Sequence, residues 1–332
     1  MAKEAILSVT FTAGCAINRD MYYVASSPDA WREAEDTPYS VMYFYQHQTE
    51  KKWFYHELPD WNVVSVCYRP PVQGAERIVH ALTEDGYVET YSRSGSSTEN
   101  LLASLSDDDS ELEYLTQIRC VDGALLVCGD AGRIYWKEQG AWTRIDQDLA
   151  ARVSDSGEVG PSTLLLLNDV GVANDGTIVT VGSDGFIAYF DRKQWRVEEK
   201  LTGSQLNRVQ VESDGTLWIA GSQGTVLTGK VGTKPTVVTR KTLKTDLYAV
   251  TVFQGVPYFG GEAGVFKYVD GKLEPIVIDG VPFTEVVVEL EAKDGVLWLL
   301  SAKKILRFDG SDWETFEHPG NIDPDTRRVM GQ

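Results

Sequence analysis

Three short glycine-bounded segments set the repeat of this chain: Gly182-Ser183-Asp184-Gly185, Gly221-Ser222-Gln223-Gly224 and Gly260-Gly261-Glu262-Ala263-Gly264. Counted from glycines 182, 221 and 261, they recur after 39 residues and again after 40. Self-similarity at a fixed period of this size is the sequence signature of a repeat architecture, in which each period forms one supersecondary unit. The rest of the chain can therefore be compared with this period.

The residues around the middle segment show what one unit contains. Ser213-Asp214-Gly215 separates two apolar runs, and an Asp-Gly pair in that position predicts a hairpin turn with positive φ at both residues. The four strands expected here are Leu206 to Val211, Thr216 to Ala220, Thr225 to Thr228 and Lys234 to Thr242. Four short antiparallel strands per period, with no helix between periods, predict a blade of a β-propeller.

The same order recurs over most of the chain, with further turns at Asp122-Gly123, Asn174-Asp175-Gly176 and Asp294-Gly295. We therefore predict an all-β fold: a seven-bladed β-propeller of four-stranded antiparallel blades, as a single domain over residues 1–319 with a C-terminal tail at 320–332. The expected blades are 5–60, 63–104, 115–149, 164–203, 206–244, 247–279 and 283–319.

The first two units match the repeat least well, so counts of six or eight blades stay open. The first strand of the chain is expected at Ala5 to Phe11, and a weak last strand of the second blade near Leu101 to Ala103. Each unit is expected to begin with its own inner strand, and closure by exchanging a strand between the ends is not evident.

Composition and charge bound the function. The formal net charge of −18 argues against nucleic acid as the main partner, because phosphate binding needs a basic face. It favours a cationic partner, although acidity that serves solubility alone is the competing interpretation. The sequence contains no run of eighteen apolar residues, so we expect no membrane span. The N-terminus lacks the apolar core of a signal peptide. We expect a cytoplasmic protein that is monomeric by itself.

Chemical motifs are sparse. No nucleophile elbow, phosphate loop or dinucleotide fingerprint occurs, and no Cys-x-x-Cys pair suggests zinc. We therefore expect no catalytic residue, no metal and no cofactor. Residues expected to be structural are four cysteines (Cys15, Cys67, Cys120, Cys128), four histidines (His47, His56, His80, His318) and three repeat tryptophans (Trp142, Trp195, Trp313).

The repeat Val181-Gly182-Ser183-Asp184-Gly185-Phe186-Ile187 resembles the propellers of the photosystem-assembly-factor and sensor-domain type, a YVTN/WD-like group. The Gly-His and Trp-Asp signatures of WD repeats are absent. Ser213-Asp214-Gly215-Thr216-Leu217-Trp218 looks like a worn Asp-box, the turn motif of sialidase-type propellers. The resemblance implies a seven-bladed propeller, and it implies no particular activity because such folds host many unrelated functions.

Three long excursions are expected on one face of the ring. The insertion Ser27 to Tyr39 joins two strands of blade one, while Ser104 to Tyr114 and Ala150 to Ser162 connect successive blades. Long loops on a rigid scaffold are where binding residues concentrate. The predicted partner-binding residues are Trp31, Glu33, Glu35, Asp36, Asp107, Asp108, Asp109, Glu111, Asp155 and Glu158. Three solvated polar loops are the competing interpretation.

A second set is expected where the inner strands begin, around the mouth of the central channel. Its members are Gln117, Asp169, Arg208, Tyr248 and Glu285. Arg208 facing Asp169 and Glu285 would form either an internal polar network or part of a ligand pocket.

The leading functional hypothesis is a non-enzymatic propeller that binds a protein partner, a basic one, through the acidic loop-rich face. A concrete version is a bacterial immunity protein that neutralises a basic toxin by covering its active site. One alternative is a glycan or small-ligand sensor, or a hydrolase or lyase, with its pocket at the channel mouth. Another is an assembly factor within a larger complex.

Overall fold

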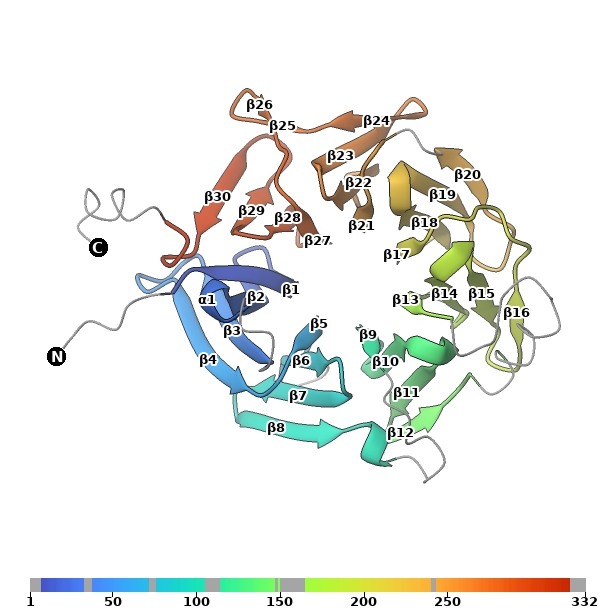
Figure 1. The fold of residues 1–332 in the computed structure, drawn as a ribbon, viewed down its shortest axis with the longest axis horizontal. Coiled ribbons are helices and arrows are strands. Elements are labelled where there is room, and N and C mark those ends of the chain that lie inside the picture. The colour runs from blue at the N-terminus through green and yellow to red at the C-terminus, as the bar shows by residue number, and fades with distance from the viewer. Residues whose placement is uncertain are drawn as a thin grey trace.

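The computed structural model describes residues 7–32, 38–71, 76–104, 114–146, 149, 165–239 and 243–322. Seven four-stranded antiparallel sheets are arranged radially around a central axis, which confirms the seven-bladed β-propeller (Figure 1). Each sheet consists of four strands that are consecutive in the sequence. The chain therefore starts each blade at the axis and ends it at the outer edge, with no strand exchanged between the first and last blades.

The first four blades contain sixteen strands, from the inner to the outer edge of each sheet. Blade one holds β1 (Val9–Asn18), β2 (Met21–Pro28), β3 (Tyr39–Gln46) and β4 (Trp53–Pro59). Blade two holds β5 (Val63–Arg69), β6 (Ile78–Thr83), β7 (Tyr87–Ser92) and β8 (Gly95–Asn100). Blade three holds β9 (Leu115–Val121), β10 (Ala124–Gly129), β11 (Ile134–Glu138) and β12 (Ala141–Arg144). Blade four holds β13 (Leu167–Val172), β14 (Ile178–Gly182), β15 (Ile187–Phe190) and β16 (Trp195–Val197).

The last three blades follow the same plan. Blade five holds β17 (Leu206–Val211), β18 (Thr216–Gly221), β19 (Thr225–Lys230) and β20 (Thr236–Thr239). Blade six holds β21 (Leu247–Phe253), β22 (Val256–Gly261), β23 (Gly264–Val269) and β24 (Lys272–Pro275). Blade seven holds β27 (Val287–Lys293), β28 (Val296–Ser301), β29 (Lys304–Phe308) and β30 (Trp313–Glu317).

Short elements complete the ring. A small hairpin, β25 (Val277–Ile278) and β26 (Val281–Pro282), lies in the connection from blade six to blade seven, and a single helical turn, α1 (Asp29–Arg32), follows β2. The 3₁₀ turns are η1 (Leu102–Ser104), η2 (Asp130–Gly132), η4 (Ser183–Gly185) and η5 (Ser222–Gly224). Within the described ranges, no helix has the length and apolar character needed to cross a membrane.

The glycine segments that reveal the repeat are tight turns between the second and third strands of a blade. A Cβ on Gly182 would lie 2.2 Å from the carbonyl oxygen of Leu166, and one on Gly185 would lie 2.0 Å from that of Thr202. Gly185 also has a φ of +75°, which other residues rarely adopt. Ser183 N–H donates to the Leu166 carbonyl at 2.9 Å, so this turn is fastened to the start of its own inner strand.

Blades two and seven keep this fastening without the first glycine. Glu84 N–H donates to the Asn62 carbonyl at 3.1 Å, and Ala302 N–H donates to that of Val286 at 3.0 Å. The glycine position is filled by Thr83 and Ser301, whose hydroxyls accept backbone N–H bonds within their own turns. The sequence repeat fades in these two blades although the backbone repeat does not.

The Asp-Gly turns are of two kinds. Asp122-Gly123 and Asp294-Gly295 have positive φ at both residues and close two-residue hairpins, as predicted. Ser213-Asp214-Gly215 does join two strands of a hairpin, as predicted, but Asp214 does not have the predicted positive φ. There Glu212 N–H donates to the Thr216 carbonyl, and the loop has three residues with Gly215 alone at positive φ. Asp214 Oδ1 instead accepts the Thr216 N–H at 2.8 Å.

Two strand predictions need correction. The first strand is Val9–Asn18 rather than Ala5 to Phe11, because the small residues around Gly14 let it run deep into the ring. The last strand of blade two is Gly95–Asn100, which is polar and exposed at the outer edge. Leu101 is fully buried next to it, so the apolar residues there mark the inward step of the chain and not a strand.

The hydrophobic core lies between neighbouring blades rather than within one. Trp195 of blade four is 1% exposed, packs in a cluster with Leu126 and Ile134 of blade three, and donates its indole N–H to the Ile145 carbonyl at 2.7 Å. Trp142 is also buried, and Trp313 stacks on Phe308. The repeat tryptophans are therefore packing residues, as predicted.

The ring closes through side chains and single backbone bonds between blades seven and one. Phe11 N–H donates to the Ala302 carbonyl at 2.8 Å, and the indole of Trp298 donates to the Asn18 carbonyl at 3.0 Å. Asn321, assigned to the tail from the sequence, accepts the Val9 N–H at 2.9 Å and donates to the Lys303 carbonyl at 2.9 Å. These residues fasten both ends of the chain at one seam.

Candidate functional site

The two faces of the ring differ in what they carry. The connections between successive blades, the tight glycine turns and α1 lie at one end of the blades, which we call the connection face (Figure 1). The two-residue hairpins such as Asp122-Gly123 lie at the opposite end, which we call the hairpin face. Long connections on a rigid ring make the connection face the better candidate for binding.

Four exposed apolar side chains lie on the connection face. Leu7 is 42% exposed just before β1, Trp31 is 41% exposed in α1, and Tyr114 is 53% exposed just before β9. Val286, 42% exposed, precedes β27 on the same face. Single exposed apolar residues are common on protein surfaces. These four, at the connection-face ends of three blades, could serve as anchors for a protein partner.

Trp31 is held in place by its neighbours. Its ring lies 4.3 Å from that of Tyr39 in an edge arrangement. Asp29, at the start of α1, accepts hydrogen bonds from Ser8, Thr10 and Lys303. Burial raises the pKa of Asp29, but the bonds from Lys303, Ser8 and Thr10 outweigh it and lower the pKa to about 2. The helical turn is thereby tied to blade seven at neutral pH.

The carboxylates predicted for the partner face lie outside the described residues: Glu33, Glu35, Asp36, Asp107, Asp108, Asp109, Glu111, Asp155 and Glu158. Their described flanks, Arg32 with Tyr39, Ser104 with Tyr114, and Leu149 with Leu165, are at the ends of connections on the connection face. The acidic partner face stays a prediction.

The channel-mouth residues are partly brought together. Asp169, with a fully buried side chain, accepts two hydrogen bonds from Arg119, at 3.0 Å and 2.8 Å. Its Oδ2 also accepts the Val209 N–H at 2.9 Å. Arg208 donates to Gln117 Oε1 at 2.8 Å. Three of the predicted residues, Gln117, Asp169 and Arg208, thus belong to one network that spans blades three, four and five.

Two predicted members of this network are misplaced. Glu285 accepts a hydrogen bond from the Ser301 hydroxyl and forms an ion pair with Lys304, both in its own blade. Arg208 donates to Glu289 instead, at 2.7 Å. Tyr248 contributes its backbone carbonyl to Arg208, while its hydroxyl donates to Glu262 at 2.9 Å on the surface. The apolar residues before Val287 have the pattern of a strand, so the sequence analysis expected this strand to begin too early in the chain.

A structural reason unites these positions. All seven inner strands contain a β-bulge near their start, where the inner strand has one residue more than the second strand that pairs with it. In blades three, four and five that extra residue reaches the next blade: Thr116 donates to the Leu167 carbonyl, Asn168 to that of Leu206, and Asn207 to that of Leu247. The sequence prediction missed these links, although a polar residue second in each strand signals them.

The channel network is internal in character. All three guanidinium nitrogens of Arg208 donate within the protein, and both oxygens of Asp169 accept more than one bond. Paired, hydrogen-bonded charges of this kind hold elements in register. The arrangement favours an internal polar network over a ligand pocket at the channel mouth.

The expected structural histidines and cysteines lie in packed surroundings. His80 Nδ1 lies 3.0 Å from the Thr90 hydroxyl, and burial lowers its pKa to about 4. The ring of His318 packs 4.3 Å from Tyr43. All four cysteines are free thiols, and burial raises the pKa of Cys128 to about 12. Within the described ranges, no group of three or more His, Cys, Asp and Glu side chains is placed to hold a metal ion.

Sequence similarity to a known protein covers part of the chain. No protein-family model matches the chain. The immune protein Tsi7 of Pseudomonas aeruginosa is 28% identical over 197 residues, which are 59% of this chain and 62% of that protein. The similarity therefore spans less than two thirds of either protein.

Solved structures show the same fold. The WD40 β-propeller domain of Doa1 superposes with a TM-score of 0.64 at 10% identity, covering 95% of both chains. YCF48 from Cyanidioschyzon merolae has a TM-score of 0.62 at 12% identity, covering 95% of this chain and 97% of that one. A structure of YCF48 bound to a D1 peptide has a TM-score of 0.61 at 14% identity, covering 92% and 93%. These comparisons show the β-propeller fold of the chain, and its seven sheets give the number of blades.

Proposed function

We propose that this protein is an immunity protein, a non-enzymatic propeller that neutralises a toxin by binding it. The observation that carries the proposal is the 28% identity to the immune protein Tsi7 over 197 residues. The fold is consistent with it, because a rigid ring presents a broad surface to a partner. In this proposal the propeller acts in the cytoplasm as a stoichiometric inhibitor.

The partner surface in this proposal is the connection face. Trp31 and Tyr114 would enter apolar pockets on the toxin, since hot spots in interfaces are rich in exposed aromatic anchors. The acidic connections around them would form a charged rim. With a net charge of −18, the propeller would attract a basic toxin and speed its encounter.

The inhibition mechanism follows from size. A typical stable interface covers about 800 Å² on each partner, which is enough to close an active-site cleft. A basic toxin that acts on a negatively charged substrate has a positively charged active site, and an acidic surface is complementary to it. The propeller needs no chemistry of its own to block that site.

Co-expression tests the proposal. The chain is produced together with the product of the gene beside its own, and the mixture is analysed by size-exclusion chromatography and by survival of cells that express the neighbour alone. We expect the neighbour to be toxic by itself, to be tolerated with the propeller, and to co-elute with it in a fixed ratio.

The test variant is Trp31→Ala with Tyr114→Ala. Its matched control is Phe54→Ala with Tyr55→Ala in β4, which removes two similarly exposed rings from the outer edge of blade one. The first pair should lose protection and the second should keep it. Protection that survives the first pair, or a neighbour that is harmless and does not bind, contradicts the proposal.

A further inference from the structure

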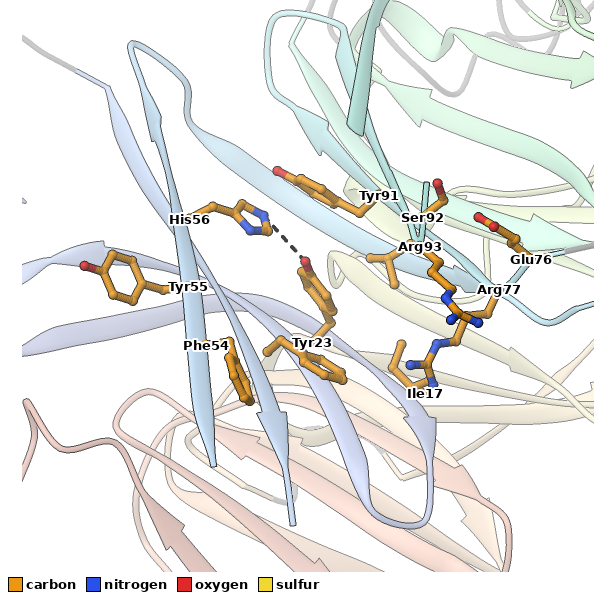
Figure 2. Close-up of a pocket in the computed structure, with 12 residues that line it drawn as sticks. Ile17, Tyr23, Phe54, Tyr55, His56, Glu76, Arg77, Tyr91, Ser92 and Arg93 are labelled. Atoms are coloured by element: carbon orange, nitrogen blue, oxygen red, sulfur yellow. Dashed lines mark hydrogen bonds between the residues drawn. The ribbon is translucent and has the colours of Figure 1, made fainter. Parts of the chain in front are cut away.

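A groove lies between blades one and two, away from the connection face. Its volume is about 730 Å³, and its wall comes from β1, β2, β3 and β4 on one side and β6 and β7 on the other (Figure 2). Arg77 just before β6 and Arg93 in the turn after β7 place it toward the hairpin face. A groove of this size is in the range of small-molecule sites, about 300 to 1,000 Å³.

One part of the groove is lined by aromatic rings. Tyr23 stacks on Tyr91 at 5.7 Å and leans on Phe44 at 5.5 Å, and His56 packs 4.3 Å from Tyr91. Phe54, 38% exposed, continues the wall toward solvent. Such a wall presents flat apolar faces on which a planar ring can stack.

The polar groups in this wall are neutral at pH 7. Burial raises the pKa of Tyr23 and lowers that of His56, whose Nε2 lies 3.5 Å from the Tyr23 hydroxyl. The wall therefore supplies hydrogen-bonding groups without charge. The charge of the groove comes from elsewhere in its lining.

Two arginines, Arg77 and Arg93, provide that charge. Figure 2 shows both on the side of the groove opposite His56 and Tyr55. Arg77 donates to the sulfur of Met21 at 3.2 Å, a weak acceptor, and neither arginine forms an ion pair with a carboxylate in the part of the chain that the structure describes. Glu76 also lines the groove, but it accepts both the N–H and the hydroxyl of Ser94.

Arg77 and Arg93 have no carboxylate partner within the described ranges, although the chain has 49 acidic and 31 basic residues. Elsewhere Arg119, Arg208 and Arg307 are each paired with an acid. Guanidinium groups bind carboxylate and phosphate in a planar, two-point manner. The cationic end and the aromatic wall therefore suit one ligand that has an anionic group and a flat ring.

We propose that the groove between blades one and two binds a small aromatic anion, with its ring against Tyr23, Tyr91 and Phe54 and its acid group on Arg77 and Arg93. This site is independent of the toxin-binding proposal because it lies toward the other end of the blades. Either proposal can fail without the other.

Calorimetry with three probes tests the assignment: 1-naphthyl phosphate, which has both parts, 1-naphthol, which lacks the anion, and inorganic phosphate, which lacks the ring. The full chain should bind 1-naphthyl phosphate with a dissociation constant below about 1 mM, given its size. The other two probes should bind at least tenfold more weakly. Equal binding of 1-naphthol or of phosphate, or no binding of 1-naphthyl phosphate, overturns the proposal.

Variants locate the site. Arg77→Gln with Arg93→Gln should weaken 1-naphthyl phosphate at least tenfold, while Lys193→Gln with Lys272→Gln, which removes the same charge from exposed positions of blades four and six, should leave it unchanged. Phe54→Ala, which removes part of the aromatic wall and keeps both arginines, should weaken the binding of 1-naphthyl phosphate. Because all of these residues are at least partly exposed, circular dichroism should show an unchanged fold. Equal weakening by the lysine pair would mean only a general charge effect and would overturn the site.

Discussion

Single residues near the axis decide how the blades are held in register. Asp169 is the clearest case, because its two oxygens join Arg119, Val170 and Val209. Gln117, Asp169 and Arg208 each stand two residues after the first apolar residue of their strand, and in the structure they share one network. The sequence analysis named Glu285 where this network contains Glu289, because the apolar run before Val287 obscures where that strand starts.

Asp169→Asn should destabilise the fold strongly. The change removes the charge of the fully buried Asp169 and leaves the half-buried guanidinium of Arg119 without its carboxylate. Breaking a buried pair typically costs about 3 to 5 kcal/mol. Asp214→Asn is the matched control, because its ion pair with Lys230 is exposed and therefore contributes little to stability. Urea unfolding measures both. Equal stability of the two variants would contradict the role given to the channel network.

A second residue-scale prediction concerns pH. Burial raises the pKa of Glu291 to about 7 from 4.5, even though its Oε2 accepts the Ala16 N–H across the seam between blades seven and one. Below pH 4.5 the carboxyl is neutral in folded and unfolded chains. Between pH 4.5 and 7 the unfolded chain ionises first, so this group's contribution to folding stability is lost as pH rises.

Glu291→Gln keeps an acceptor oxygen for Ala16 and removes the titration. The wild type should therefore lose roughly 1 to 3 kcal/mol of unfolding free energy relative to this variant between pH 4.5 and 7.5. Glu138→Gln, at an exposed hairpin, should show no such trend. Parallel pH profiles for the wild type and Glu291→Gln would be inconsistent with the raised pKa.

At the scale of elements, the seam between the first and last blades is the distinctive feature. The ring has no exchanged strand, and Asn321 holds Val9 and Lys303 together from beyond the last strand. The repeat period and the Asp-Gly turns made seven blades predictable. They could not reveal the seam, because a closing contact has no counterpart in the other blades and so leaves no repeat signal.

Asn321→Ala should loosen this seam. It removes the acceptor of the Val9 N–H and the donor to the Lys303 carbonyl, which we expect to cost about 1 to 3 kcal/mol. Asn174→Ala is the control, because its exposed amide donates to Ser213 between two interior blades. Hydrogen exchange should speed up in β1 and β29 for Asn321→Ala only. Faster exchange spread evenly over all blades would argue against a local seam.

For the whole molecule, the shape follows from the sequence and the partner does not. The sequence repeats from blade to blade because the same close backbone contacts recur, as at Gly182 and Gly185. The architecture can therefore be predicted from a single sequence. A binding surface is made once and has no such internal copies. The predicted acidic positions, including Asp107, Asp108 and Asp109, lie outside the described residues. The immunity function that we propose therefore rests on the similarity to an immune protein and not on the repeat.

The central claim is that the acidic connection face binds a basic toxin. The most direct test measures the affinity of the purified propeller for the neighbouring gene product over a series of salt concentrations. Two triple variants with equal charge change are compared. The first is Asp107→Asn, Asp108→Asn, Asp109→Asn, which lies outside the described residues and which we predict to belong to the connection face. The second is Asp122→Asn, Asp270→Asn, Asp294→Asn in two-residue hairpins of the hairpin face. Asparagine tolerates positive φ in those hairpins, so the control should fold normally.

We predict that wild-type binding weakens steeply with salt, because charged rims are screened over about 8 Å at physiological ionic strength. The connection-face variant should bind at least tenfold more weakly at low salt with a shallower salt dependence, and the hairpin-face variant should match the wild type. Affinity that is independent of salt, or that falls equally in both variants, would contradict the account.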